Sequence, residues 1–367
     1  MIRRFSTITR RTPLFNLQQK LNPVIGTFAG YDLPMNFKYN KTIDVIKGIR
    51  NDGIGIFDVS HMGIIELSSN KKNDIKKTLE KIFPVNAENL KINKSALTVL
   101  LNDKGYVQDD LIVSNLDNKY RLVVNASNKY NILNLLKYYN DTNIDIKMKN
   151  KIILAIQGSN SSKLLEDLTQ HNFDNLYFND NITINSELEI ARTGYTGEDG
   201  FELYCNIDYG IDLYKKLIDL KKENIYFGGL VERDILRMEA GLCLSGNEFG
   251  EKMEVNFSDL NMNFIIGKRR RNTGGFIGFN NINKKSQNRI GLFSDRPLKI
   301  GDFIYNNNMI VGKITSSTKS FNLDKFISIG YINVNINDDI YTIKNKKKID
   351  LTITKLPFIK NNFYRKD

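Results

Sequence analysis

The C-terminal part of the chain consists of short apolar runs, and this feature most constrains what the chain can fold into. After Gly267, runs rich in isoleucine, valine or threonine are separated by glycine and asparagine turns: IGLFS, IVGKITSS, SIGYINV, YTIKN and DLTITK. Runs of this length are too short for stable helices and are typical of strands that pair antiparallel through tight turns. The sequence therefore predicts a separate small β-barrel or β-sandwich over residues 267–367.

Strands and helices alternate in the upstream part. IGIFDV and GIIELS look like strands around a turn, and DIKKTLEKIF has the apolar spacing of a short amphipathic helix. ALTVLL, YVQDDLIVS and KYRLVVN, separated by turns at 102–105 and 115–118, predict an antiparallel meander. KIILAIQG predicts a buried strand that leads into a helix at SSKLLEDL, and SELEIARTGYTGEDGFELYCN reads as two strands joined by a glycine-rich loop. The predicted class is α+β with mostly antiparallel sheets.

The clearest helix follows Gly228. Its apolar residues repeat at i, i+4, i+7 and i+11, namely Val231, Ile235, Met238 and Leu242. The same helix presents Arg233 and Arg237 one turn apart, a spacing that allows two guanidinium groups to bind carboxylates. The alternative is a surface ion pair between Asp234 and Arg237.

Composition narrows the possible functions. The chain has 367 residues, of which 41% are hydrophobic and 26% charged, which excludes a disordered chain. No apolar run approaches the ~20 residues of a membrane-spanning helix, so no membrane association is expected. Two cysteines and two histidines are too few for a disulfide framework or for a metal site built on several imidazoles. The net charge of +12 favours an anionic partner or substrate, or an organelle address.

The N-terminus has the composition of a targeting peptide. MIRRFSTITRR combines arginines with hydroxyl and apolar residues, and no Asp or Glu occurs before Asp32. This pattern is typical of a mitochondrial transit peptide, with a frayed basic terminus as the alternative. We expect residues 1–11 to be the transit peptide and the mitochondrial matrix to be the location.

Two adjacent acids interrupt a predicted strand. Asp109 and Asp110 lie within YVQDDLIV, and aspartate is disfavoured in strands. Because successive side chains of a strand point to opposite faces, only one of the two carboxylates is expected to face a given pocket. The structural alternative is a bulge or a sheet edge.

Other motifs are less specific by themselves. GYTGEDGFE, from Gly194 to Glu202, combines glycines that permit close backbone approach with acids that accept hydrogen bonds from N–H groups, although a plain hairpin turn would look similar. The chain lacks a complete phosphate loop or dinucleotide-binding fingerprint. The basic cluster GKRRR at 267–271 lacks interleaved aromatic residues, so a solvated loop, a dock for an acidic protein or a brace between domains is favoured over nucleic-acid binding.

Taken together and in order, nine segments closely resemble the aminomethyltransferase (T-protein) family of the glycine cleavage system. They are RTPLF, FAGYDLPMNF, GIFDVSHMG, DDLIV, LAIQG, ARTGYTGEDGFE, VERDILRMEAGLCLSGNE, IGKRRR and LPFIKNNFY. The resemblance implies a three-domain cloverleaf around a central folate pocket, with a C-terminal barrel or jelly roll. The domains are expected at 12–51 plus 144–266 (a first folate-binding domain), 52–143 (a second domain with the catalytic strand) and 267–367.

The resemblance also implies an activity. The methylene of an aminomethyl group on the lipoyl arm of the H-protein would pass to tetrahydrofolate, giving 5,10-methylenetetrahydrofolate, ammonia and the dihydrolipoyl H-protein. Tetrahydrofolate would be the cosubstrate, no metal is implied, and the P-protein and L-protein would be functional partners.

The site residues implied by the resemblance are few. Asp110 takes the position of the catalytic acid, Glu202 that of the pterin-binding glutamate and Arg233 that of the folate-binding arginine. Asn125 and Tyr195 match pocket positions. Phe363 stands where the family has a substrate-contacting tyrosine, which removes a hydroxyl and keeps the ring.

Three related functions agree less well with the sequence. The leading alternative is a folate-binding iron–sulfur cluster assembly protein of the same fold, whose cysteine-containing signature does not occur here. Dehydrogenases that carry the folate module need a flavin domain and greater length. A basic RNA-binding protein is poorly supported by the scattered basic residues.

Overall fold

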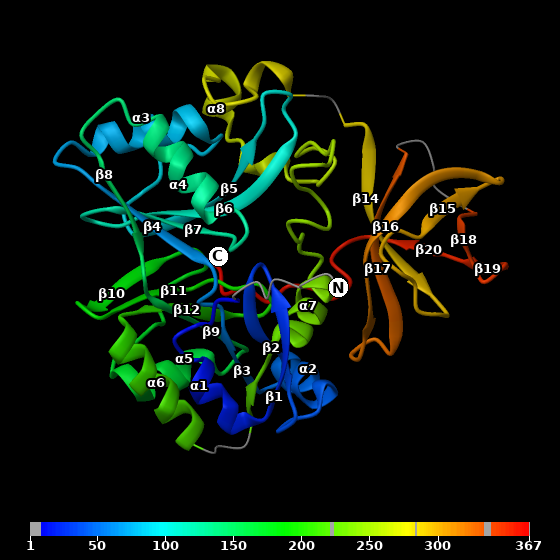
Figure 1. The fold of residues 1–367 in the computed structure, drawn as a ribbon, viewed down its shortest axis with the longest axis horizontal. Coiled ribbons are helices and arrows are strands. Elements are labelled where there is room, and N and C mark those ends of the chain that lie inside the picture. Colours follow the sequence, from blue (N-terminus) through cyan, green and yellow to red (C-terminus); the bar gives the residue numbers. More distant parts are fainter. Residues whose placement is uncertain (1–8, 221–223, 283–284, 334–338, 367) are drawn as a thin grey trace, which may run out of the picture.

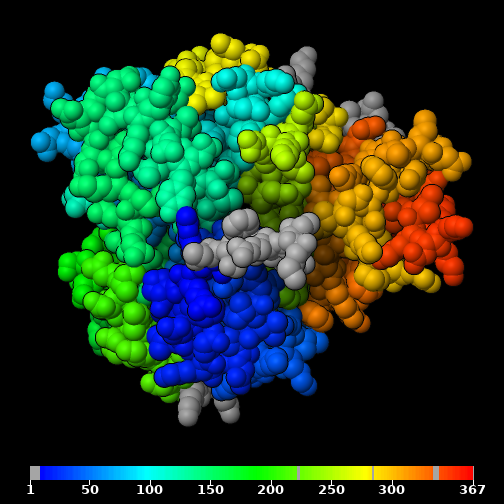
Figure 2. Space-filling model, in the orientation of Figure 1, coloured from blue at the N-terminus to red at the C-terminus, as the bar shows by residue number. Residues whose placement is uncertain are grey.

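The structure is a computed structural model that describes residues 9–220, 224–282, 285–333 and 339–366. Within these residues it is an α+β fold in which three large sheets lie around a central region, with the C-terminal sheet to one side (Figure 1). Figure 2 shows the same three parts in contact, with the residues of the N-terminal hairpin on the front face. The predicted fold class is confirmed.

A six-stranded sheet forms the first part, in the order β10-β11-β12-β9-β3-β13. Its strands are β3 (Ile54–Asp58), β9 (Ile152–Gln157), β10 (Asn181–Asn185), β11 (Leu188–Ala191), β12 (Gly200–Cys205) and β13 (Ile225–Phe227). The neighbours pair antiparallel except β13 and β3, which are parallel. The two strands predicted on either side of the glycine-rich loop are β11 and β12.

Helices cover both faces of this sheet, which explains the unbroken apolar run of β9. Ile152, Leu154 and Ile156 share a core with α5 (Ser161–Thr169) and α6 (Ile207–Asp219). Ile153 and Ala155 point to the other face and share a core with α2 (Thr42–Arg50) and α7 (Leu230–Glu239). A strand that is buried on both faces needs apolar residues at every position.

The N-terminal residues add a short helix, α1 (Phe15–Gln18), and the antiparallel hairpin β1 (Pro23–Phe28) and β2 (Tyr31–Phe37). This hairpin was not predicted from the sequence. Most of the expected transit peptide lies outside the described residues. Thr9 and Arg10, however, are bonded to the hairpin: Thr9 Oγ1 donates to Asp32 Oδ2 (2.7 Å), and Arg10 O accepts from Asp32 N (2.8 Å).

A five-stranded antiparallel sheet forms the second part, in the order β5-β6-β7-β4-β8. Its strands are β4 (Gly63–Ser68), β5 (Lys94–Leu101), β6 (Val107–Asn115), β7 (Tyr120–Val124) and β8 (Asp145–Lys149). α3 (Lys72–Ile82) and α4 (Lys129–Tyr138) share a core with one face. The predicted meander is confirmed as β5, β6 and β7.

Sheet membership differs from the domain limits expected at residues 52 and 143. β3 pairs with β9 and β13 of the six-stranded sheet, whereas β8 pairs with β4 of the five-stranded sheet. β3 and β4 are therefore strands on either side of a turn, as predicted. The two strands do not pair with each other, because the turn leads from one sheet to the other. The chain crosses between the sheets after Asp58 and again before Ile152. The hydrophobic pattern marked both strands but held no information on their partners.

The C-terminal part is a curled seven-stranded antiparallel sheet in the order β19-β18-β15-β16-β17-β14-β20, with a core of its own. Its strands are β14 (Gln287–Ser294), β15 (Phe303–Asn306), β16 (Met309–Ser320), β17 (Lys325–Asn333), β18 (Tyr341–Lys344), β19 (Lys347–Asp350) and β20 (Thr352–Thr354). This confirms the predicted C-terminal β-sheet region, but the sheet begins at Gln287. The first residues of the expected range 267–367 instead include a short helix, α8 (Lys268–Thr273), which pairs with Glu80 of α3.

Buried polar bonds join this sheet to α7. Glu239, the last residue of α7, is completely buried and accepts hydrogen bonds from Arg50 Nε (3.0 Å) and Ser320 Oγ (2.6 Å). One carboxylate thus connects α2, α7 and β16, and its partners satisfy the charge that burial would otherwise leave uncompensated.

Candidate active site

The two adjacent acids lie where β6 extends past the end of β7. β6 and β7 pair from Leu111 and Val124, so Asp109 and Asp110 precede the paired stretch and Asn125 follows it. Asn125 Nδ2 lies 2.8 Å from Oδ1 of Asp109 and 2.8 Å from Oδ1 of Asp110. Both carboxyl groups therefore bond the same amide, although burial still alternates along β6, as expected for side chains on opposite faces of a strand. This is possible because Asn125 lies beyond the strand end, where its amide reaches both acids.

Burial and mutual repulsion alter the acidity of this pair. Asp109 has no exposed surface, and burial raises the pKa of its carboxyl group. Burial, followed by the charge of Asp109, raises the pKa of Asp110 to about 7. Hydrogen bonding from Asn125 and the positive charge of Arg233 act in the opposite direction. Asp110 therefore exchanges its proton near neutral pH, as a general acid or base requires.

Arg233 comes to this region from the first half of α7. Its guanidinium lies 4.5 Å from the centre of the Tyr195 ring, an arrangement that favours the cation. Burial lowers the pKa of Arg233, while Tyr195 and Glu202 oppose that effect. Arg233 thus interacts electrostatically with Asp110 on one sheet and Glu202 on the other.

The glycine-rich loop between β11 and β12 positions Tyr195. Its hydroxyl donates to the carbonyl of Cys243, and burial raises the pKa of the phenol, which therefore stays protonated. Gly197 has φ +81°, and a Cβ there would lie 2.6 Å from Cβ of Ala240. The loop can follow this path against α7 only with glycine at position 197.

Glu202 lies on β12, which follows the loop. Glu202 is half-buried, and its Oε2 accepts a hydrogen bond of 2.7 Å from the Tyr204 hydroxyl. Two strands, two loops and a helix therefore bring together five of the six residues singled out in the sequence: Asp110, Asn125, Tyr195, Glu202 and Arg233.

Phe363 is not joined to this cluster. Its ring stacks on Phe178 with 4.2 Å between centroids. Across the described residues, no hydrogen bond or ring contact links Phe363 to Asp110 or Arg233. The tail does run beside the glycine-rich loop, because Asn362 N donates to Gly197 O (2.7 Å).

His61 is buried near Arg233 and Lys129. Burial, and then the charges of Arg233 and Lys129, lower its pKa to about 3, so the imidazole is neutral at physiological pH. Its Nδ1 has no partner among the residues that the structure describes. The nearby Asp58 is bonded to Ser60, Thr12 and Gln18 instead of to His61. In the sequence, the only feature that could have indicated a role for His61 was that it is a single histidine in an apolar stretch.

The basic cluster lies on α8 (Lys268–Thr273), beside α3. Arg269 Nε donates to Asn86 Oδ1 (2.8 Å), and both Arg269 and Arg270 pair with Glu80. Arg270 is buried and also donates to the carbonyl of Gly274 (2.7 Å). These contacts favour the bracing role for Arg269 and Arg270 over a free docking face.

Among the described residues, no cluster of His, Cys, Asp and Glu has the arrangement of a metal site. The helices of the described chain include none that is long and apolar enough to cross a membrane.

Comparisons with known proteins agree with this architecture. Residues 14–270 match the GCVT N-terminal domain, and residues 288–360 match the glycine cleavage T-protein C-terminal barrel domain. The chain is 32% identical to the mitochondrial aminomethyltransferase of Pisum sativum, with 97% of this chain and 91% of the relative covered. It is also 32% identical to an aminomethyltransferase of Thermoanaerobacter pseudethanolicus, with 98% of each chain covered.

A solved structure has the same fold. The glycine cleavage system aminomethyltransferase T from Bartonella henselae superimposes with a TM-score of 0.90 at 28% identity, covering 97% of this chain and 99% of that one. Family models match both the N-terminal and the C-terminal segments, the relatives match over nearly the full length of the chain, and a solved member has the same fold. This chain therefore belongs to the glycine cleavage T-protein family.

Proposed function

We propose that the protein is a tetrahydrofolate-dependent aminomethyltransferase of glycine cleavage. It would accept an aminomethyl group from the lipoyl arm of the H-protein and transfer the methylene to N5 and N10 of tetrahydrofolate. Ammonia and the dihydrolipoyl carrier would be released. The P-protein and L-protein would act before and after it, and the matrix location would follow from the basic N-terminus.

The observation that carries this proposal is Asp110, a carboxyl group with a pKa of about 7 that is held by Asn125 and faces the charge of Arg233. In its ionised form Asp110 would stabilise positive charge that develops on the folate amines as they attack the aminomethyl carbon. It would also accept or orient a proton during that step.

The remaining residues fit a folate ligand by their chemistry. Oε1 of Glu202 accepts no hydrogen bond from any described residue, so it is free for the N–H donors of a pterin. Arg233 would bind an anionic or carbonyl oxygen of the ligand, and the Tyr195 ring would hold that guanidinium in place. Asn125 would orient Asp110. Phe363 would contact the ligand as part of the C-terminal tail, which runs beside Gly197.

A turnover assay tests the proposal. Lipoylated H-protein loaded with an aminomethyl group is mixed with the protein, with and without tetrahydrofolate, and ammonia and 5,10-methylenetetrahydrofolate are measured. Folate-dependent formation of both products in equal amounts is the expected result. Folate binding without turnover would contradict the proposal and favour the iron–sulfur assembly alternative.

A further inference from the structure

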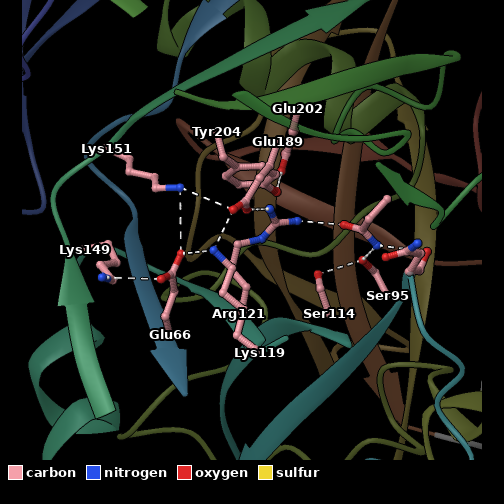
Figure 3. Close-up of polar contacts among 12 residues, drawn as sticks. Glu66, Ser95, Ser114, Lys119, Arg121, Lys149, Lys151, Glu189, Glu202 and Tyr204 are labelled. Carbon is pink, nitrogen blue, oxygen red and sulfur yellow. Dashed lines mark hydrogen bonds and ion pairs between the residues drawn. The ribbon is translucent and has the colours of Figure 1, made fainter. Parts of the chain in front are cut away.

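A completely buried arginine lies between the six-stranded and five-stranded sheets (Figure 3). Arg121, on β7, donates from Nη1 to Glu189 Oε2 (2.7 Å) and from Nη2 to Asn181 Oδ1 (2.7 Å). Its guanidinium carbon lies 3.6 Å from the centre of the Tyr204 ring. Both ends of the guanidinium are therefore fixed, and its planar face supports the ring.

Tyr204 connects this arginine to the proposed folate site. It lies two residues after Glu202 on β12, so both side chains are on the same face of the strand. Tyr204 is 1% exposed, and its hydroxyl donates to Glu202 Oε2 at 2.7 Å. Burial raises the pKa of the phenol well above its usual value, so it remains a hydrogen-bond donor.

We propose that Tyr204, supported by Arg121, is a positioning residue that fixes the carboxylate of Glu202 for tetrahydrofolate. This inference rests on the proposed function. The hydrogen bond to Oε2 leaves Oε1 for the ligand and restricts the rotation of the glutamate side chain before binding. A side chain that is already ordered loses less entropy when the ligand arrives.

The surrounding charges make this support rigid. Glu189 also pairs with Lys119 (2.6 Å) and Lys151 (3.5 Å), and Lys119 pairs with Glu66 (2.7 Å). The network therefore connects β4 and β7 of one sheet with β10 and β11 of the other (Figure 3). Tyr204 lies against a guanidinium that several elements hold in place, so its hydroxyl has a fixed position relative to Glu202.

The test removes only the hydroxyl. Tyr204→Phe keeps the ring against Arg121 and is expected to raise the Kd and KM for tetrahydrofolate about threefold to tenfold, because the Glu202 side chain must then be ordered on binding. The kcat is expected to change less than twofold. Tyr120→Phe is the matched control. Tyr120 precedes Arg121 on β7, is equally buried, and its hydroxyl has no partner among the described residues. Its variant is expected to leave the Kd unchanged, and an unchanged Kd in Tyr204→Phe would overturn the inference.

A double-mutant cycle with Glu202→Gln separates this inference from the proposed function. If Tyr204 acts through Glu202, Tyr204→Phe adds little loss of affinity in the Glu202→Gln background. Fully additive losses would contradict the positioning role while leaving the folate site intact. If Glu202→Gln alone leaves folate affinity unchanged, the assignment of Glu202 in the proposed function is wrong.

Arg121→Lys tests whether Arg121 holds the Tyr204 ring in place. Lysine keeps a positive charge beside Glu189 but cannot lie flat against the ring while bonding Asn181. We expect a rise in Kd that disappears in the Tyr204→Phe background. A rise of the same size in both backgrounds would contradict the role of Arg121.

Discussion

Asn125 and Asp110 are joined by a hydrogen bond of 2.8 Å between Nδ2 and Oδ1. The same amide nitrogen lies 2.8 Å from Oδ1 of Asp109, so one donor serves two adjacent carboxyl groups. Two carboxylates this close repel each other, and holding one proton between them relieves that repulsion. The arrangement gives Asp110 a defined orientation and a pKa near neutrality, and both properties lead to predictions.

Asp110→Asn is expected to reduce kcat about 10²- to 10⁴-fold, the range for loss of a general acid or base, with little change in the Kd for tetrahydrofolate. Asparagine keeps the size of the side chain and its bond from Asn125 but cannot accept a proton. Single-turnover measurements with loaded H-protein and calorimetric titration with tetrahydrofolate give the two quantities. A full-rate Asp110→Asn variant would show that Asp110 is not the catalytic group.

Asp109→Asn is expected to shift the pH profile of kcat instead of abolishing turnover. Burial and then the charge of Asp109 raise the pKa of Asp110 to about 7. If the ionised form is active, wild-type kcat falls as the pH drops through about 7. Without the charge of Asp109 the pKa of Asp110 falls, so this acid limb moves to lower pH. Rates measured from pH 5.5 to 9 check the shift, and an unmoved limb would exclude Asp110 as the titrating group.

Glu202→Gln is expected to weaken tetrahydrofolate binding by ~1.5–3 kcal/mol, about tenfold or more, because a charge-assisted hydrogen bond is lost. Glu187→Gln is the control, because Glu187 is an exposed residue at the turn before β11 in the same sheet. Equilibrium titration compares the two variants. Equal affinities would mean that Glu202 has no role in binding.

Much of the fold could be predicted from local patterns. The apolar run of β9 and the i, i+4, i+7 stripe of α7 each identified an element, since burial on one or both faces imposes its own period. The partners of the strands were not predictable in this way. β3 and β4 follow each other in the sequence and lie in different sheets, which depends on contacts with β9 and β7 far along the chain.

The candidate site, too, could be predicted only in part from local sequence patterns. The pair Asp109–Asp110 stood out because acids are rare in strands, but its bond to Asn125 depends on where β7 ends relative to β6. Tyr204 and Arg121 gave no signal in the sequence, because a tyrosine in a strand and an arginine in an apolar run look like ordinary strand residues. Their pairing across two sheets became visible only in three dimensions.

Arg270→Met is expected to destabilise the protein by about 1–3 kcal/mol, because the buried carbonyl of Gly274 and the carboxylate of Glu80 lose a donor. The free energy of unfolding from urea titration measures this. Lys268→Met, on an exposed position of the same short helix, is the control and is expected to leave stability within about 0.5 kcal/mol. The H-protein concentration that gives half-maximal rate is expected to be unchanged in Arg270→Met, since Arg270 braces α8 against α3. Unaltered stability together with a raised H-protein requirement would instead place Arg270 in the docking face.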